Sequence, residues 1–184
     1  SYVQTTKDVT LKSHVGDELT ACTLRQYVDS DFASCYATSK STSGGWLELV
    51  GPRTQFVLSF SSRKQTAVSR SSTEAEVASA DSGVRRELLP VAILVDAVLG
   101  QRTRLELLED SEACLRILNG LVSKEMRHMA RTHRISTHFL QEQILAKEVL
   151  SRYVNTKLQK ADPFTKAITA RDAWTAAMTL LNIS

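Results

Sequence analysis

The chain has 184 residues, of which 42% are hydrophobic, and this is enough for one globular domain with a buried core. Its net charge of +3 at pH 7 permits a polyanionic partner but does not require one. The longest apolar stretch, residues 88–95, is too short to cross a bilayer, and the first residues lack the pattern of a signal peptide. No contact with a membrane is therefore expected.

The first third of the chain predicts three antiparallel strands in a meander. Residues 24–31 form the first expected strand. Residues 37–45 are rich in Ser, Thr and Gly and predict a turn. Residues 46–50 and 54–60, separated by Gly51-Pro52-Arg53, predict a hairpin.

A long helix is expected next, because apolar residues recur with helical period over residues 77–98. Ser71 or Thr73 can cap this helix, since each has a glutamate three residues later. Gly100 ends the pattern as a C-terminal cap, and Pro90 should kink or break the helix.

The remaining segments alternate between expected strands and helices. In order they are a buried strand (105–108), a short helix (111–118), a helix that follows the basic stretch at 124–134 and ends near residue 147, a last strand (149–154), and one or two closing helices (161–181). Because the later strands need helical crossovers, this order predicts an α/β fold. Its mixed sheet has five strands, three antiparallel and then two parallel, and is flanked by helices.

Four acidic residues lie where these strands end or helices begin, namely Asp29, Glu76, Asp110 and Asp162. Carboxylates gathered from such positions suit Mg²⁺ or Mn²⁺, and two such ions can clamp a phosphate. Each residue also has an ordinary alternative, as the cap of a turn or helix or as a partner of the helix dipole. Asp29 shares a strand face with Asp31, and like charges there repel unless a cation compensates. Together the positions favour a metal site, although spacing does not choose between Asp29 and Asp31.

The motifs around these residues resemble the ribonuclease H domain of copia-type LTR-retrotransposon Pol polyproteins. Residues 27–33 are similar to the first acidic motif of that family, residues 40–44 to the turn after it, and residues 59–76 to its third strand and first helix. Residues 109–113 are similar to its Cys-Asp-Asn-x-Ala motif, and residues 159–166 to its Ala-Asp-x-x-Thr-Lys ending. The matches follow the family order over nearly the whole chain.

The resemblance implies a ribonuclease H-like fold with residues 1–20 as a remnant of the reverse transcriptase connection, 21–170 as the ribonuclease H domain, and 171–184 as a C-terminal helix. It selects Asp29 over Asp31. It also implies that two Mg²⁺ ions, or Mn²⁺, bind the catalytic residues, which are Asp29, Glu76, Asp110 and Asp162. Phe32, Val77 and Pro163 depart from the family pattern, and the basic stretch follows it only loosely.

The function that the resemblance implies is cleavage of the RNA strand of RNA–DNA hybrids during reverse transcription. The implied partners are the hybrid and the reverse transcriptase polymerase domain of the same polyprotein. The implied location is the cytoplasm, inside a virus-like particle, or the nucleus.

Residues beside Glu76 are candidates for contacts with the substrate. Ser72 and Thr73 can recognise a 2′-hydroxyl, the group that distinguishes RNA from DNA, or can instead cap the helix. Three basic residues near the same loop can hold phosphates or remain solvated, namely Arg63, Lys64 and Arg70. His133 is either a proton carrier or an ordinary surface or phosphate-contacting histidine.

Two other functions stay open at this point. One is a catalytically inactive ribonuclease H-like module that binds hybrids or acts as a scaffold in a polyprotein. The other is a DNA nuclease of the integrase type on the same fold. The four intact carboxylates argue against the first, and the copia-like ending argues against the second.

Overall fold

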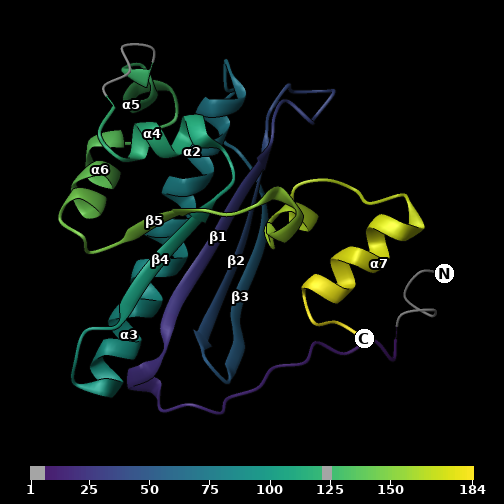
Figure 1. The fold of residues 1–184 in the computed structure, drawn as a ribbon. Helices are drawn as coiled ribbons and strands as arrows, with labels where there is room; N and C mark the ends of the chain where they lie inside the picture. Colours follow the sequence, from purple (N-terminus) through teal and green to yellow (C-terminus); the bar gives the residue numbers. More distant parts are fainter. Residues whose placement is uncertain (1–6, 122–125) are drawn as a thin grey trace.

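The centre of the molecule is a five-stranded sheet, which the computed structural model of residues 7–121 and 126–184 shows in full (Figure 1). The strand order is β3-β2-β1-β4-β5. The strands are β1 (Thr23–Asp31), β2 (Thr42–Gly51), β3 (Thr54–Lys64), β4 (Arg104–Glu109) and β5 (Leu150–Tyr153). β2 is antiparallel to both β1 and β3, whereas β4 is parallel to β1 and β5 is parallel to β4. The expected mixed sheet is confirmed.

The turn predicted over residues 37–45 is wrong at its C-terminal end, because Gly44 and Gly45 lie inside β2. These glycines serve close packing and do not form the turn. A Cβ atom on Gly44 would lie 2.5 Å from the carbonyl oxygen of Ala161, so a larger residue would collide with the neighbouring backbone.

The long helix forms without a break but changes its winding. α2 (Ser72–Gly83) continues into the π-helical segment η2 (Val84–Leu88) and then into α3 (Leu89–Leu99). Pro90 lies in the first turn of α3, directly after the wider π-helical turns, which is how the chain accommodates it. Ser71 is the cap, since its hydroxyl accepts from the backbone N–H of Glu74 at 3.2 Å. Gly100 ends the helix in the left-handed conformation, with φ of 66°.

The second half of the chain adds four more α-helices among the described residues: α4 (Glu112–Leu118), α5 (Met129–Thr132), α6 (Thr137–Leu145) and α7 (Arg171–Leu180). The helix expected after the basic stretch is α6, and the short helix α5 lies within the stretch itself. Arg134 has a φ of +56°, which ends helical winding, and Ser136 then caps a new helix. Residues 124 and 125 of the basic stretch lie outside the described residues.

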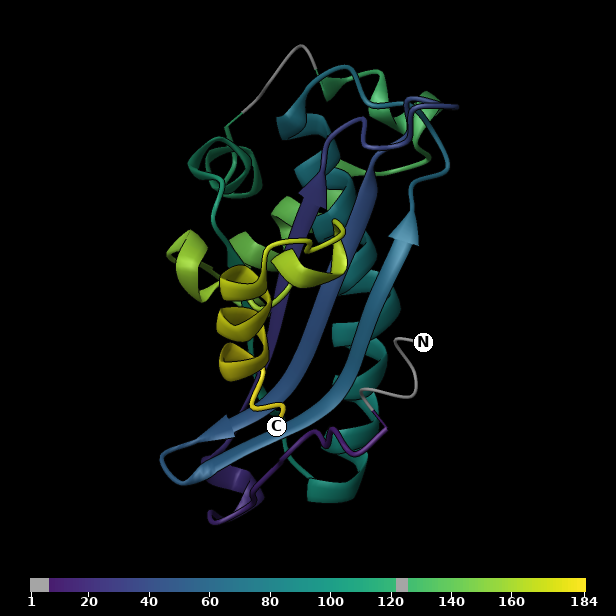
Figure 2. The same cartoon turned by 90° about the vertical axis from the view of Figure 1, so that its right-hand side faces the viewer.

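The sheet has a buried cluster on each face. One cluster lies beneath α2 and α3 and includes Leu24, Val28 and Leu107. The other includes Trp46 and Tyr27, and the 3₁₀ turn η5 (Asp162–Phe164) covers it. Figure 2 shows α2 and α3 behind the sheet and η5 and α7 in front of it. One face is therefore covered by helices from the middle of the sequence and the other by segments near its C-terminal end.

The N-terminal segment is paired with the end of the chain. The backbone N–H of Thr10 donates to the carbonyl of Ser184 at 2.9 Å, and the N–H of Ser184 donates back to Thr10 at 3.0 Å. Leu11 and Ile183 form an isolated antiparallel bridge next to them. No helix within the described residues combines the length and the apolar character needed to cross a membrane.

Candidate active site

Asp29 and Asp110 meet at one edge of the sheet. β1 and β4 are parallel, with Tyr27 in register with Leu108, and each aspartate follows its paired residue by two positions. The carboxyl ends of adjacent parallel strands lie at the same edge, so the two side chains start close together. Asp29 is buried, with 8% of its surface exposed.

Asp162 reaches the same edge from the face of the sheet that η5 covers. Thr165 links the two aspartates, because its hydroxyl donates to Asp29 Oδ2 at 3.1 Å and its Oγ1 is also 2.9 Å from the carbonyl of Asp162. The ammonium of Lys166 lies 2.6 Å from Asp162 Oδ1. Gly44 makes this approach possible, since a Cβ atom there would lie 2.7 Å from Cγ2 of Thr165.

A buried ion pair holds the turn before Asp162 against the sheet. The ammonium of Lys160 donates to both carboxylate oxygens of Glu48, at 2.8 and 2.7 Å. The side-chain amide of Gln159 donates to the backbone carbonyl of Val28 at 2.9 Å, directly before Asp29. These contacts fix the position of the Asp162 turn relative to Asp29.

Glu76 approaches from α2, on the other face of the sheet, together with a carboxylate that the sequence analysis missed. Glu109, the last residue of β4, is completely buried, and its Oε1 accepts from the N–H of Ser111 at 3.0 Å. Oε2 of Glu76 and Oε2 of Glu109 are both buried without a hydrogen-bond partner among the described residues. Period two in β4 was the available signal, since Leu105, Leu107 and Glu109 all point into the core.

Two solved structures share this arrangement of strands and helices, whereas no family model matches the chain. One is the ribonuclease H1 LC11, isolated from compost by a metagenomic approach, with a TM-score of 0.51 and 13% identity over 78% of this chain and 92% of that chain. The other is the N-terminal RNase H domain of Rv2228c from Mycobacterium tuberculosis, solved as a fusion with maltose-binding protein. Its TM-score is 0.50 and its identity 14%, over 85% of this chain and 96% of that chain.

The chain has a ribonuclease H-like fold. This confirms the fold class that the sequence motifs predicted. At these identities the likeness concerns the fold, so any activity has to be argued from the side chains of this chain.

In this ribonuclease H-like fold the acidic side chains lie close enough to perturb one another. Burial, together with repulsion from Asp110 and Asp162, raises the pKa of Asp29 to about 6, although the hydrogen bond from Thr165 opposes the rise. Burial also raises the pKa of Glu76, with added repulsion from Glu109, Asp29 and Asp110. Glu76 and Glu109 therefore have pKa values well above the ordinary range of a glutamate, and they stay protonated at higher pH.

The donor set fits a hard divalent cation in its chemistry. Every group is a carboxylate, and two buried carboxylate oxygens have no partner, which a cation would satisfy. In the observed positions, no three His, Cys, Asp or Glu side chains of residues 7–121 and 126–184 are arranged to coordinate a metal ion. The ion pair between Lys166 and Asp162 occupies Oδ1 of this carboxylate, and the ammonium charge opposes a cation beside it.

The candidate substrate residues fall into two groups. Ser72 and Thr73 lie in the first turn of α2, and since Ser71 is the cap, the capping alternative for them is wrong. The backbone N–H of Arg70 donates to the Glu74 carboxylate at 3.1 Å, and Arg70 itself is exposed. Arg63 and Lys64 instead line a cavity on another side of α2.

His133 is buried, so the surface alternative for this residue is wrong. Its Nε2 lies 3.2 Å from the hydroxyl of Ser69, and its Nδ1 lies 3.3 Å from Glu74 Oε1. His128 contacts the same Glu74 oxygen at 3.1 Å. These contacts join α5 to the start of α2. The spacing of the histidines in the sequence did not indicate this structural role.

The raised pKa values predict that the metal-free protein becomes less stable as the pH rises. Folded Asp29 and Glu76 keep protons that the unfolded chain has already released, so the free energy of unfolding falls from about pH 4 upward, through about pH 6 for Asp29 and further for Glu76. We expect the melting temperature in EDTA to fall between about pH 5 and pH 8. Glu76→Gln should flatten this dependence, and a melting temperature that rises over this range would contradict it.

Proposed function

We propose that the chain is an endoribonuclease that hydrolyses the RNA strand of RNA–DNA hybrids. The observation that carries the proposal is the meeting of Asp29, Glu76, Asp110 and Asp162, from four separate segments, at one edge of a ribonuclease H-like sheet. Fold alone does not determine function, but carboxylates gathered at one edge suit the metal ions of two-metal phosphodiester hydrolysis.

The four carboxylates would hold two Mg²⁺ or Mn²⁺ ions. Bound there, the ions would lower the pKa of the attacking water and neutralise charge on the scissile phosphate. The protein's own part is to position the ligands. Thr165 orients Asp29 through Oδ2, and the Lys160–Glu48 ion pair anchors the turn of Asp162.

Residues at the start of α2 would recognise the RNA strand. Ser71 caps α2, so the hydroxyls of Ser72 and Thr73 are not used as the helix cap. They lie one helical turn before Glu76 and can contact a 2′-hydroxyl next to the scissile phosphate. The exposed Arg70 beside them would contact a phosphate. These assignments make the strand that touches α2 the one that is cut.

The sequence motifs support a role in retrotransposon reverse transcription, with the polymerase domain of the same polyprotein as partner. The work would then take place in a cytoplasmic virus-like particle or in the nucleus. The two similar solved structures carry the ribonuclease H name and support the hydrolase part of this proposal.

The decisive experiment offers the protein three labelled duplexes, RNA–DNA, RNA–RNA and DNA–DNA, in Mg²⁺, Mn²⁺ or EDTA. We expect cuts in the RNA strand of the hybrid alone, and only with a metal ion. Equal cleavage of the DNA duplex would defeat the proposal in favour of an integrase-type nuclease.

One observation favours a second candidate, a hybrid-binding module without activity. Asp162 is engaged by Lys166, and the extra carboxyl of Glu109 adds repulsion beside Glu76. A protein that binds the hybrid but cuts it in neither Mg²⁺ nor Mn²⁺ would establish this candidate. Restoration of cleavage by Lys166→Gln would then identify the ion pair as the cause.

A further inference from the structure

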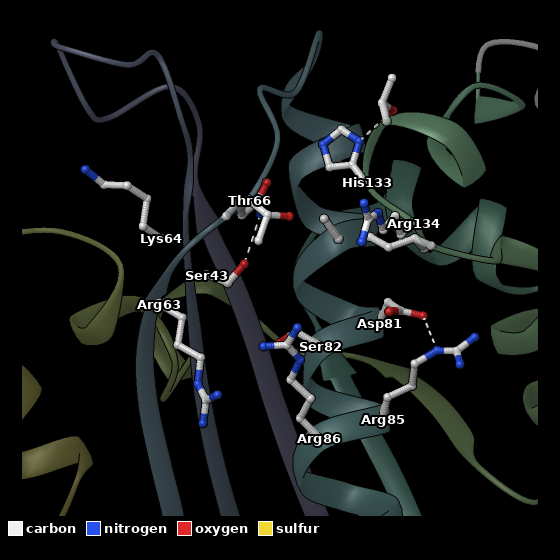
Figure 3. A pocket seen from close by; sticks show the side chains of 14 residues that line it. Ser43, Arg63, Lys64, Thr66, Asp81, Ser82, Arg85, Arg86, His133 and Arg134 are labelled. Carbon is white, nitrogen blue, oxygen red and sulfur yellow. Dashed lines mark hydrogen bonds and ion pairs between the residues drawn. The ribbon is translucent and has the colours of Figure 1, made fainter.

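A polar cavity lies beside α2, away from the four carboxylates. Its volume is about 570 Å³, and its wall is formed by the end of β3, by α2 and η2, and by the segment between α5 and α6 (Figure 3). From α2 it takes Ala78, Asp81 and Ser82. With 3.6 residues per turn, these positions point to roughly the opposite side of the helix from Glu76. The cavity is therefore separate from the candidate active site.

Three exposed guanidinium groups surround this cavity without a partner. Arg63 comes from β3, Arg86 from η2 and Arg134 from the segment before α6. Their guanidinium groups make no hydrogen bond or ion pair within residues 7–121 and 126–184. We call this site the three-arginine groove. Asp81 is the one carboxylate among the described residues of the lining, and the positive charges around it outnumber it, so this concave surface attracts anions.

The other charged residues of the groove are already engaged. Arg85 donates to Asp81 at 2.7 Å and stacks over the ring of Phe139 at 3.9 Å. The ammonium of Lys64 donates to the sulfur of Cys35 at 2.9 Å. The single carboxylate in the described wall, Asp81, is bonded to Arg85 and is also attracted by Arg86, so the charge left over is positive.

The lining matches a sugar–phosphate backbone better than a base. Its described residues include no Phe, Tyr or Trp on which a base can stack, and the ring of His133 is buried against Ser69 and Glu74. Its apolar residues are Ala78 and Ile135. Hydroxyls stand beside the arginines, on Ser43, Thr66 and Ser82. Arginine and hydroxyl groups are the usual contacts of phosphate oxygens, and such contacts carry no sequence information. A cavity of this volume accepts a stretch of one strand and not a duplex.

We propose that the three-arginine groove binds the backbone of a single nucleic-acid strand, independently of base sequence and apart from the carboxylates. A strand held there lies across the helix from Glu76, so it is bound without being cut. The groove thus adds a strand-holding function to the hydrolysis proposed above, and it does not depend on that hydrolysis.

The test measures the affinity for a fluorescein-labelled oligothymidylate by anisotropy at several salt concentrations in EDTA. The groove variant carries Arg63→Gln, Arg86→Gln and Arg134→Gln. The control carries Lys7→Gln, Lys12→Gln and Arg171→Gln, which removes the same charge from exposed positions outside the groove. Loss of three phosphate contacts should make the slope of log K against log salt shallower by about 2, and weaken binding on the order of a hundredfold at 0.1 M salt.

The control should keep the wild-type slope and lose only a few-fold in affinity. An abasic oligonucleotide should compete nearly as well as oligothymidylate. Equal losses of affinity in both variants, with equal melting temperatures, would contradict the proposal for the groove. Competition by tripolyphosphate or polyglutamate as strong as that by oligothymidylate would also contradict it. Hybrid cleavage is measured separately. If the wild type never cuts but the groove variant alone loses strand binding, the proposed function fails and the groove stands.

Discussion

Asp29→Asn is expected to reduce hybrid cleavage in Mg²⁺ by about a thousandfold or more while leaving hybrid binding intact. Asparagine keeps the size of the side chain and can still accept the hydrogen bond of Thr165, but it removes the charge between Asp110 and Asp162. A metal-bound carboxylate contributes several kcal/mol to such a reaction, and about 1.4 kcal/mol corresponds to tenfold in rate. Single-turnover cleavage and electrophoretic binding assays measure the two effects.

The same variant should be more stable than the wild type in EDTA, because a repelled buried charge is gone. Its melting temperature should respond less to Mg²⁺. Asp31→Asn is the matched control, since Asp31 lies two residues further along β1 and is more exposed. We expect it to cleave within a few-fold of the wild type. Loss of activity in Asp31→Asn with full activity in Asp29→Asn would reverse the assignment.

Gly44→Ala is expected to damage both stability and cleavage. The new Cβ would lie 2.5 Å from the backbone carbonyl oxygen of Ala161, which cannot move without the turn that carries Asp162. Overpacking of this kind typically costs about 1–3 kcal/mol in the free energy of unfolding. A displacement of Asp162 from Asp29 by roughly 1 Å is enough to cost about a hundredfold in rate. Chemical denaturation and cleavage kinetics measure the two losses.

Gly45→Ala is the control for this substitution. Its Cβ would lie 2.8 Å from the hydroxyl oxygen of Ser61, a side chain that can rotate away. We expect a smaller loss of stability and cleavage within a few-fold of the wild type. If Gly44→Ala unfolds no more easily than Gly45→Ala and cuts normally, then η5 does not depend on the close approach at Gly44.

The strands and helices could be predicted because local patterns encode them. Apolar runs mark β1 and β4, and helical period marks α2 and α3. The error at Gly44 and Gly45 has a physical cause, since a Ser- and Gly-rich segment has the same composition whether glycine serves a turn or a close approach between backbones. Only the position of Ala161, far along the chain, decides between them.

The candidate site was predictable in its four acidic positions and not in their surroundings. The motif identifies Asp110 and not Glu109, although the alternation of β4 points Glu109 inward. The Glu48–Lys160 ion pair joins residues 112 positions apart, and no local pattern records such a pairing. The same is true of Arg63, Arg86 and Arg134, which meet only once the fold is formed.

The pairing of Thr10 with Ser184 brings the N-terminal segment and the C-terminus to one corner of the molecule. Because Thr10 and Ser184 lie side by side, a short peptide that joined them would make the chain circular. New ends can then be opened at the exposed hairpin tip of Pro52 and Arg53, which leaves every strand of the sheet intact. A polypeptide fused before Thr10 and another fused after Ser184 would both be attached to the domain at this same corner.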